Sequence, residues 1–154
     1  MSDYKAYLQR MRSVIEWYDT KVLPLLSGIL DVETRKKVAA IDADLAALDG
    51  SIEPGFLLDK PEDTATAMGY AYVMEGSTLG GKMILQHVRQ LLPVTEENGA
   101  AYFAGYGADT GRHWKEFLAA FTGYTITHNA EEKVTAAAVA LFSALHSHFE
   151  AVAA

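Results

Sequence analysis

Apolar residues recur at alternating spacings of three and four along most of this 154-residue chain. Such spacing puts one apolar stripe on each helix, and no alternating strand pattern extends beyond Tyr70–Met74. The sequence therefore predicts an all-α fold of about five helices. They are expected over residues 4–25, 33–48, 61–92, a short stretch around 114–121, and 130–151, with a loop containing Pro54 and Pro61 before the third.

The composition fits one globular domain spanning residues 1–154. Half of the residues are hydrophobic and 21% are charged, and 13 basic against 20 acidic residues give a net charge of −7. That sign disfavours nucleic acid and anionic membranes as partners. Cysteine is absent, which excludes thiolate metal sites and fits the cytoplasm. No apolar run approaches the roughly 18–20 residues of a membrane span.

Three glycines interrupt the third expected helix at Gly76, Gly80 and Gly81. Glycine inside a helix costs about 0.8–1 kcal/mol relative to alanine, so we expect a kink or an opened turn there. Bare backbone of this kind lets another helix approach closely, or lets a flat ligand lie against it.

Two common kinds of site are not supported by the sequence. The segment from Gly76 to Lys82 resembles a phosphate-binding loop, but Met83 stands where the magnesium-binding hydroxyl belongs and no preceding strand is expected. No Glu-x-x-His pair is present, and His146 and His148 are two residues apart, so they do not share a helix face. A dedicated side-chain metal cage is not expected.

Two histidines are weak candidates for binding a metal. His148 falls in the apolar stripe of the last helix, where an imidazole needs a hydrogen-bond partner or a ligand, and a satisfied core histidine is the favoured interpretation. His87 lies near the end of the glycine-bearing helix, where a cation also suits the helix dipole. The other three, at positions 113, 128 and 146, are expected on the surface.

Two sequence blocks resemble the bacterial heme oxygenases, including those that accompany bacterial phytochromes. They are Tyr72-Val-Met-Glu-Gly-Ser-Thr-Leu-Gly-Gly81 and Tyr102-Phe-Ala-Gly-Tyr-Gly-Ala-Asp-Thr-Gly111, followed by Trp114 and Phe117. The resemblance runs from about Tyr4 to the C-terminus and is strongest over residues 67–121. It implies an all-helical fold in which heme lies between a helix with an axial histidine and a kinked, glycine-bearing distal helix.

The resemblance implies a role for several residues. Gly76, Gly80 and Gly81 would contact the porphyrin, and Ser77 would position distal water. Arg112 and Lys115 are candidates for pairing with the propionates, although a solvated helix face is an equally good reading. Heme would be both cofactor and substrate, opened to biliverdin, carbon monoxide and iron with oxygen and an external electron donor.

The sequence departs from the family at one point. Heme oxygenases begin with a helix that carries the axial histidine, whereas this chain resembles them from their second helix and has no histidine before His87. Three explanations stay open: the sequence lacks the first helix, another residue binds the iron, or the protein is a non-catalytic scaffold for a tetrapyrrole, another apolar ligand or a partner protein. An apolar face left uncovered in this way predicts self-association, with a homodimer as the expected form.

Overall fold

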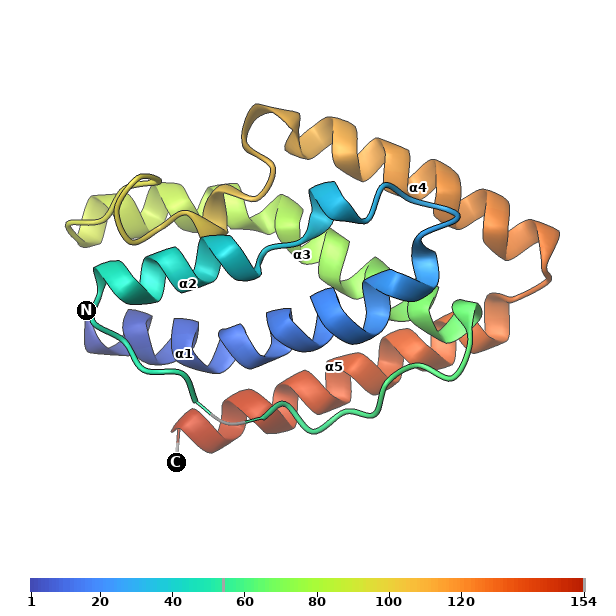
Figure 1. Ribbon diagram of the computed structural model, residues 1–154, viewed down its shortest axis with the longest axis horizontal. Coiled ribbons are helices and arrows are strands. Elements are labelled where there is room, and N and C mark those ends of the chain that lie inside the picture. The colour runs from blue at the N-terminus through green and yellow to red at the C-terminus, as the bar shows by residue number, and fades with distance from the viewer. Residues whose placement is uncertain (54, 154) are drawn as a thin grey trace.

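The computed structural model describes residues 1–53 and 55–153, with side chains up to residue 150, so Pro54 lies outside the described residues. Five α-helices and no β-strand are found in this part of the chain, which confirms the all-α prediction (Figure 1). None of the described helices is long and apolar enough to cross a membrane. The α-helices are α1 (Ser2–Trp17), α2 (Val38–Ala47), α3 (Thr64–Leu91), α4 (Thr110–Thr127) and α5 (Glu131–Ala153).

The first helix keeps its predicted extent, but its end is wound differently. After α1 the chain makes a π-helical turn over Tyr18–Val22 and a 3-10 turn over Leu23–Leu26, where Pro24 cannot donate a backbone hydrogen bond. The consecutive side chains of Tyr18 and Asp19 are both buried, which shows that the π turn directs both of them inward.

The prediction of a single helix over residues 33–48 is wrong. A short 3-10 turn (Glu33–Arg35) precedes α2, which begins only at Val38. The reason is a capping interaction from far away in the sequence. The Asp19 carboxylate accepts the backbone N–H groups of Lys37 and Val38 at 2.8 and 2.9 Å. These groups begin α2, so a side chain on the preceding element satisfies the helix start.

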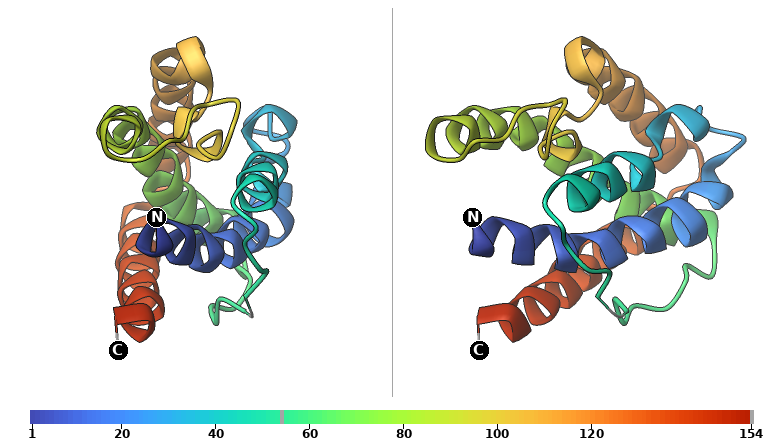
Figure 2. Two further views of the ribbon diagram at one scale, coloured as in Figure 1. Left: turned by 90° about the vertical axis from the view of Figure 1, so that its left-hand side faces the viewer. Right: turned by 60° about the vertical axis from the view of Figure 1, so that its left-hand side comes forward.

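The third helix begins at a carboxylate cap and continues through its glycines. Asp63 accepts the backbone N–H of Thr66 at 2.9 Å, and α3 then runs for 28 residues. Its axis bends midway along, as Figures 1 and 2 show, without an opened turn. Of the two expected distortions, the bend is therefore the one found.

Helices α3 and α5 cross closely and then diverge. At the crossing a side chain on Gly69 would meet the carbonyl oxygen of Val134 at 2.4 Å and the Ala137 methyl at 2.6 Å. Figure 2 shows α1 and α2 on one side of this helix pair, and no helix of the described chain on its other side. One face of α3 is consequently left open beyond the crossing.

Candidate site on the glycine face of α3

The open face of α3 carries two glycines among large apolar residues. We call Tyr72, Gly76, Leu79, Gly80 and Met83 the glycine face, because steps of three or four residues place them on one side of the helix. Met83 is 76% exposed, and Tyr72 and Leu79 are about two-fifths exposed. Large apolar side chains in such exposed positions on one helix face mark a binding surface.

The three glycines have different surroundings. A side chain on Gly80 would meet nothing within 4 Å, and one on Gly76 would come within 3.7 Å of the Trp114 ring. Gly81 lies on the buried side, where a side chain would meet the Phe103 carbonyl oxygen at 2.9 Å. Gly76 and Gly80 therefore present bare backbone on the open face, whereas Gly81 allows a loop to pack against α3.

Aromatic side chains from α4 border the glycine face. The Tyr72 ring lies 5.9 Å from the Trp114 ring and 5.0 Å from the Phe121 ring, measured between centroids. Phe117 is fully buried and anchors α4, and its ring centroid lies 5.7 Å from that of Trp114. These rings are tilted against one another and form an aromatic border at the edge of the bare backbone.

Ser77 is exposed and follows Gly76 on α3. Its hydroxyl donates to the Met74 carbonyl at 2.7 Å, so the proton is committed to the helix backbone. The oxygen lone pairs stay free and can accept a hydrogen bond from water.

The two candidate cations lie on one side of α4, about 60° apart around its axis. Arg112 pairs with Asp109 at 3.1 Å and lines a surface groove with Thr34 and Glu116. Helical geometry places Arg112 about 160° and Lys115 about 100° around α4 from Trp114. Since Trp114 faces Gly76, Lys115 lies closer to the glycine face of the two.

The two histidine candidates also differ. His148 is half-buried, and its Nε2 lies 2.9 Å from the Arg10 carbonyl oxygen and 3.3 Å from the Ser13 hydroxyl. Its imidazole is thus a satisfied structural group between the rings of Phe56 and Phe149. His87 is exposed on α3, seven residues beyond Gly80.

A buried ionic cluster lies directly beneath the glycine face, and sequence reasoning missed it. Glu75 precedes Gly76 and is only 2% exposed. Its carboxylate accepts hydrogen bonds from Tyr18 at 2.8 Å and from Arg35 and Tyr106 at 2.5 Å each. The Lys37 ammonium lies 3.7 Å from the same carboxylate.

The charges of the cluster shift one another's titration. Burial opposes ionisation of Glu75, but Lys37, Tyr106 and Arg35 outweigh it, so the Glu75 pKa lies below its ordinary value. Burial lowers the pKa of Lys37, and Glu75 and Asp19 offset part of that shift. Burial and the Glu75 charge raise the pKa of Tyr106. Glu75 is therefore ionised, and the hydroxyl groups of Tyr18 and Tyr106 are neutral hydrogen-bond donors to it.

The same cluster fixes α4 relative to α3. Arg35 also donates to the His113 carbonyl oxygen at 3.1 Å, and the Tyr106 ring stacks on the His113 ring at 4.1 Å. His113 adjoins Trp114, which borders Gly76. The buried charges thereby set the position of the aromatic border against the bare backbone.

One signal in the sequence could have identified this cluster. Glu75 is the only charged residue between Asp63 and Lys82, within a helix that is otherwise apolar or small. A lone carboxylate in such a segment needs buried partners. The spacing of residues within α3 does not identify those partners, because they are residues 18, 35, 37 and 106, which lie outside this helix.

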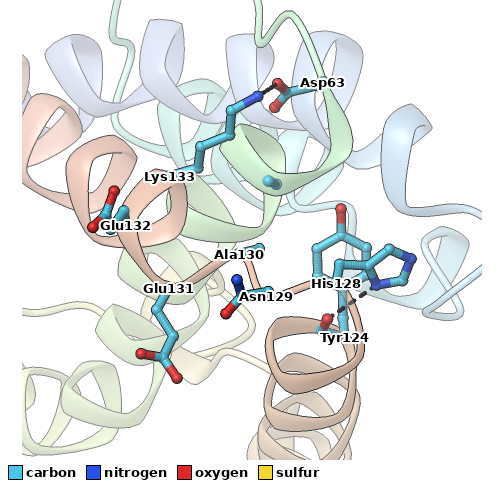
Figure 3. A pocket seen from close by; sticks show the side chains of 9 residues that line it. Asp63, Tyr124, His128, Asn129, Ala130, Glu131, Glu132 and Lys133 are labelled. Carbon is cyan, nitrogen blue, oxygen red and sulfur yellow. Dashed lines mark hydrogen bonds and ion pairs between the residues drawn. The ribbon is translucent and has the colours of Figure 1, made fainter.

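Two cavities lie apart from the glycine face. A hollow of about 600 Å³ lies at the turn between α4 and α5, at the opposite end of α3 from Met83 (Figure 3). Its polar groups bind one another: Lys133 lies 2.8 Å from Asp63, and the His128 ring lies 3.0 Å from the Tyr124 carbonyl. A second cavity of about 80 Å³ lies beneath Ser77 and is lined by Lys37. It has room for water but not for a ligand of ordinary size.

The described residues hold no group of three or more His, Cys, Asp or Glu side chains able to bind a metal ion. What the open face offers is a flat apolar surface of bare helix backbone with an aromatic border. This arrangement suits a planar apolar ligand.

Comparisons with known proteins point to one family. The heme oxygenase family model matches residues 58–151, which is more than half of the chain. The heme oxygenase from Neisseria meningitidis, solved in NO- and CO-bound forms, has a similar fold with a TM-score of 0.77 and 24% identity. That match covers 97% of this chain and 78% of the Neisseria chain. No curated protein matches the chain.

Proposed function

The chain belongs to the heme oxygenase family, and from this premise we propose that its glycine face binds the tetrapyrrole ring of heme. The observation that carries the proposal is the bare backbone at Gly80, where a side chain would point into open space. A flat ring can approach such a backbone more closely than it can approach any other residue type.

The residues present fit the porphyrin face. Gly76 and Gly80 leave the helix backbone uncovered, and Met83 and Leu79 add apolar contacts. Trp114 provides an aromatic edge beside them. We propose that Lys115 pairs with a propionate at the rim, with Arg112 as the second cation on the same helix.

The residues present do not supply an iron ligand opposite this wall. His148 is held by the Arg10 carbonyl, and His87 lies on the same helix face as Gly80. The ligand therefore has to come from a group outside the glycine face.

Bound heme supplies the iron that reacts with oxygen, and it is itself the substrate opened to biliverdin, carbon monoxide and iron with electrons from an external donor. The chain's own residues bind and orient the ring. The Ser77 oxygen accepts a hydrogen bond from water beside the glycine face, and Glu75 holds Gly76 against Trp114 through Arg35.

A second candidate function is a non-catalytic scaffold that binds a tetrapyrrole, another apolar ligand or a partner protein. The observation that favours it is the hydrogen bond between His148 and the Arg10 carbonyl, which engages this candidate iron ligand within the fold. Iron without an axial imidazole or thiolate has lost the main group by which a protein tunes heme reactivity.

Titration with hemin tests binding. We expect a saturable, sharp Soret band for the wild-type chain and loss of this band in Gly80→Leu, because the new side chain occupies the space of the ring. Gly123→Leu is the matched control: Gly123 is also an exposed helical glycine with nothing nearby, about 180° around α4 from Trp114. Equal binding by the two variants would overturn the proposal.

Catalysis is measured separately, on the complex of the chain with hemin. A reductant and air should convert the Soret band to a biliverdin spectrum if the chain is an enzyme. A Soret band that persists under these conditions would favour the scaffold function.

A further inference from the structure

An extended segment crosses α1 and α5 before α3 begins (Figure 1). We call its described residues, 51–53 and 55–61, the strap. The Phe56 ring of the strap is half-buried, with its centroid 5.1 Å from that of Trp17 on α1 and 5.3 Å from that of His148 on α5. The next side chain, Leu57, is 96% exposed. Phe56 therefore fastens the strap to both helices, and Leu57 stays uncovered beside it.

A cavity of about 400 Å³ lies where the strap meets these helices, and we call it the strap cavity. Its lining includes Arg10 on α1, Phe56 and Leu57 on the strap, and Ala144, Ser147 and His148 on α5. Small-molecule sites in proteins have volumes of about 300–1,000 Å³. No residue of the glycine face lines this cavity, so it is separate from the proposed heme site.

Arg10 gives the strap cavity a positive charge. None of the residues that line the cavity is an aspartate or a glutamate. Within the described part of the chain, no carboxylate lies within 4 Å of the Arg10 guanidinium, whereas Arg12, Arg35 and Arg112 each pair with one. The Arg10 side chain is half-buried. A half-buried guanidinium without a counter-ion is a binding group for an anion.

The other walls of the strap cavity are mostly apolar and are held in place. The rings of Phe56 and His148 meet edge to face. The His148 Nε2 donates to the Arg10 carbonyl oxygen at 2.9 Å, because a carbonyl oxygen only accepts. The backbone of Arg10 thereby fixes the imidazole, while its side chain makes no hydrogen bond to the described residues. Ala144 and Leu57 add apolar contacts beside these rings.

We propose that the strap cavity binds a small aromatic monocarboxylate. The two carboxylate oxygens accept hydrogen bonds from the Arg10 guanidinium, whose planar fork matches their spacing. The aromatic body of the ligand lies against Phe56 and Leu57. One cation without an acidic neighbour in the lining suits a single negative charge, since a dianion would keep one charge without a partner.

Titration of the full chain with indole-3-acetate, followed by proton–nitrogen-15 NMR, tests the proposal. We expect saturable shifts at the amides of Leu57 and Ser147. Indole-3-acetamide lacks the charge and acetate lacks the ring, and each should bind about tenfold more weakly or worse. Shifts that do not saturate, or equal binding of the acid and its amide, would overturn the proposal.

Two substitutions test the walls of the cavity. Arg10→Met removes the guanidinium but keeps the backbone carbonyl that holds His148, and it should weaken indole-3-acetate binding about tenfold or more. Arg89→Met is its control, because Arg89 is an exposed arginine of α3 outside the cavity. Ala144→Leu fills the cavity with the charge intact and should abolish binding. Unchanged affinity in a folded Ala144→Leu or Arg10→Met variant would contradict the proposal.

Hemin titration separates this site from the glycine face. Gly80→Leu should lose hemin binding and keep indole-3-acetate binding, and Arg10→Met should do the reverse. A chain that binds indole-3-acetate but no hemin would overturn the proposed function while the strap cavity stands. Competition between the two ligands in the wild-type chain would place the carboxylate on the glycine face and overturn the strap-cavity proposal.

Discussion

The guanidinium of Arg35 reaches the carboxylate of Glu75 at 2.5 Å, and the two side chains are 3% and 1% exposed. Arg35 belongs to a short 3-10 turn and Glu75 to the middle of α3. The other terminal nitrogen of Arg35 donates to the backbone carbonyl of His113 in α4. One guanidinium therefore joins the 3-10 turn, α3 and α4. The position of Trp114 beside α3 depends on this pair, because Arg35 holds the backbone of the adjoining His113.

Glu75→Gln should destabilise the fold strongly. The substitution keeps the shape of the side chain but leaves Arg35 and Lys37 buried without their counter-charge, which costs about 3–5 kcal/mol. Urea unfolding followed by circular dichroism measures the loss. The control is Glu16→Gln, because Glu16 is half exposed and its pair with Arg12 should contribute under about 1 kcal/mol. Equal losses in the two variants would contradict the role given to Glu75.

Asp44→Asn should loosen the loop before α4. The Asp44 carboxylate, 1% exposed, accepts the backbone N–H groups of Ala101 and Tyr102 at 2.7 and 2.8 Å. An amide replaces one acceptor by a donor, so one N–H loses its partner at a cost of about 1–3 kcal/mol. Hydrogen exchange at residues 101 and 102 should rise. Asp42→Asn, on the outer side of the same helix, should leave this exchange unchanged.

Gly69 and Gly80 should respond oppositely to alanine. Gly69→Ala forces a methyl group against the Val134 carbonyl at the α3–α5 crossing, and such overpacking costs about 1–3 kcal/mol. Gly80→Ala places its methyl in open space and should raise helix stability by about 0.5–1 kcal/mol. Thermal unfolding of the heme-free chain distinguishes them. A stabilised Gly69→Ala variant would show that the helices do not cross here.

Acid should weaken the start of α3. Asp63 pairs with Lys133 and accepts the backbone N–H of Thr66, and these contacts lower its pKa from 3.8 to about 2. A lowered carboxyl pKa stabilises the fold above pH 3.8, and this contribution is lost as the pH falls toward 2. Carbon-13 titration of Asp63 should show the midpoint near 2, rising toward 3.8 in Lys133→Met. A midpoint that does not move would show that the ion pair is absent in solution.

The sequence is sufficient to predict the helices because each apolar stripe is local. The three-four spacing places α3 and α5 to within about three residues at each end. It underestimates α4, which runs over Thr110–Thr127 and not only around 114–121, and it does not show that α1 ends at Trp17. It fails between residues 33 and 38, where the Asp19 carboxylate caps α2 from another segment. Spacing within a segment cannot report a hydrogen bond made across the fold.

The candidate site shows the same division. Gly76 and Gly80 stand out in the sequence by their effect on a helix, and the structure places both on the open face of α3. The separation of Gly81 from them, and the cluster around Glu75, depend on tertiary packing. Whether Ser77, Arg112 and Lys115 act on a bound ring stays a prediction.

The π turn at Tyr18–Val22 has a consequence for the order in which the chain folds. It aims Tyr18 at Glu75 and Asp19 at α2, yet Tyr106 and the His113 carbonyl complete the same cluster from almost 90 residues later. During synthesis, the N-terminal hundred residues therefore leave the ribosome with Glu75 and two cations that are not yet fully partnered. The core of this protein should close late, after α4 has emerged, and nascent chains shorter than this should stay open to proteases and chaperones.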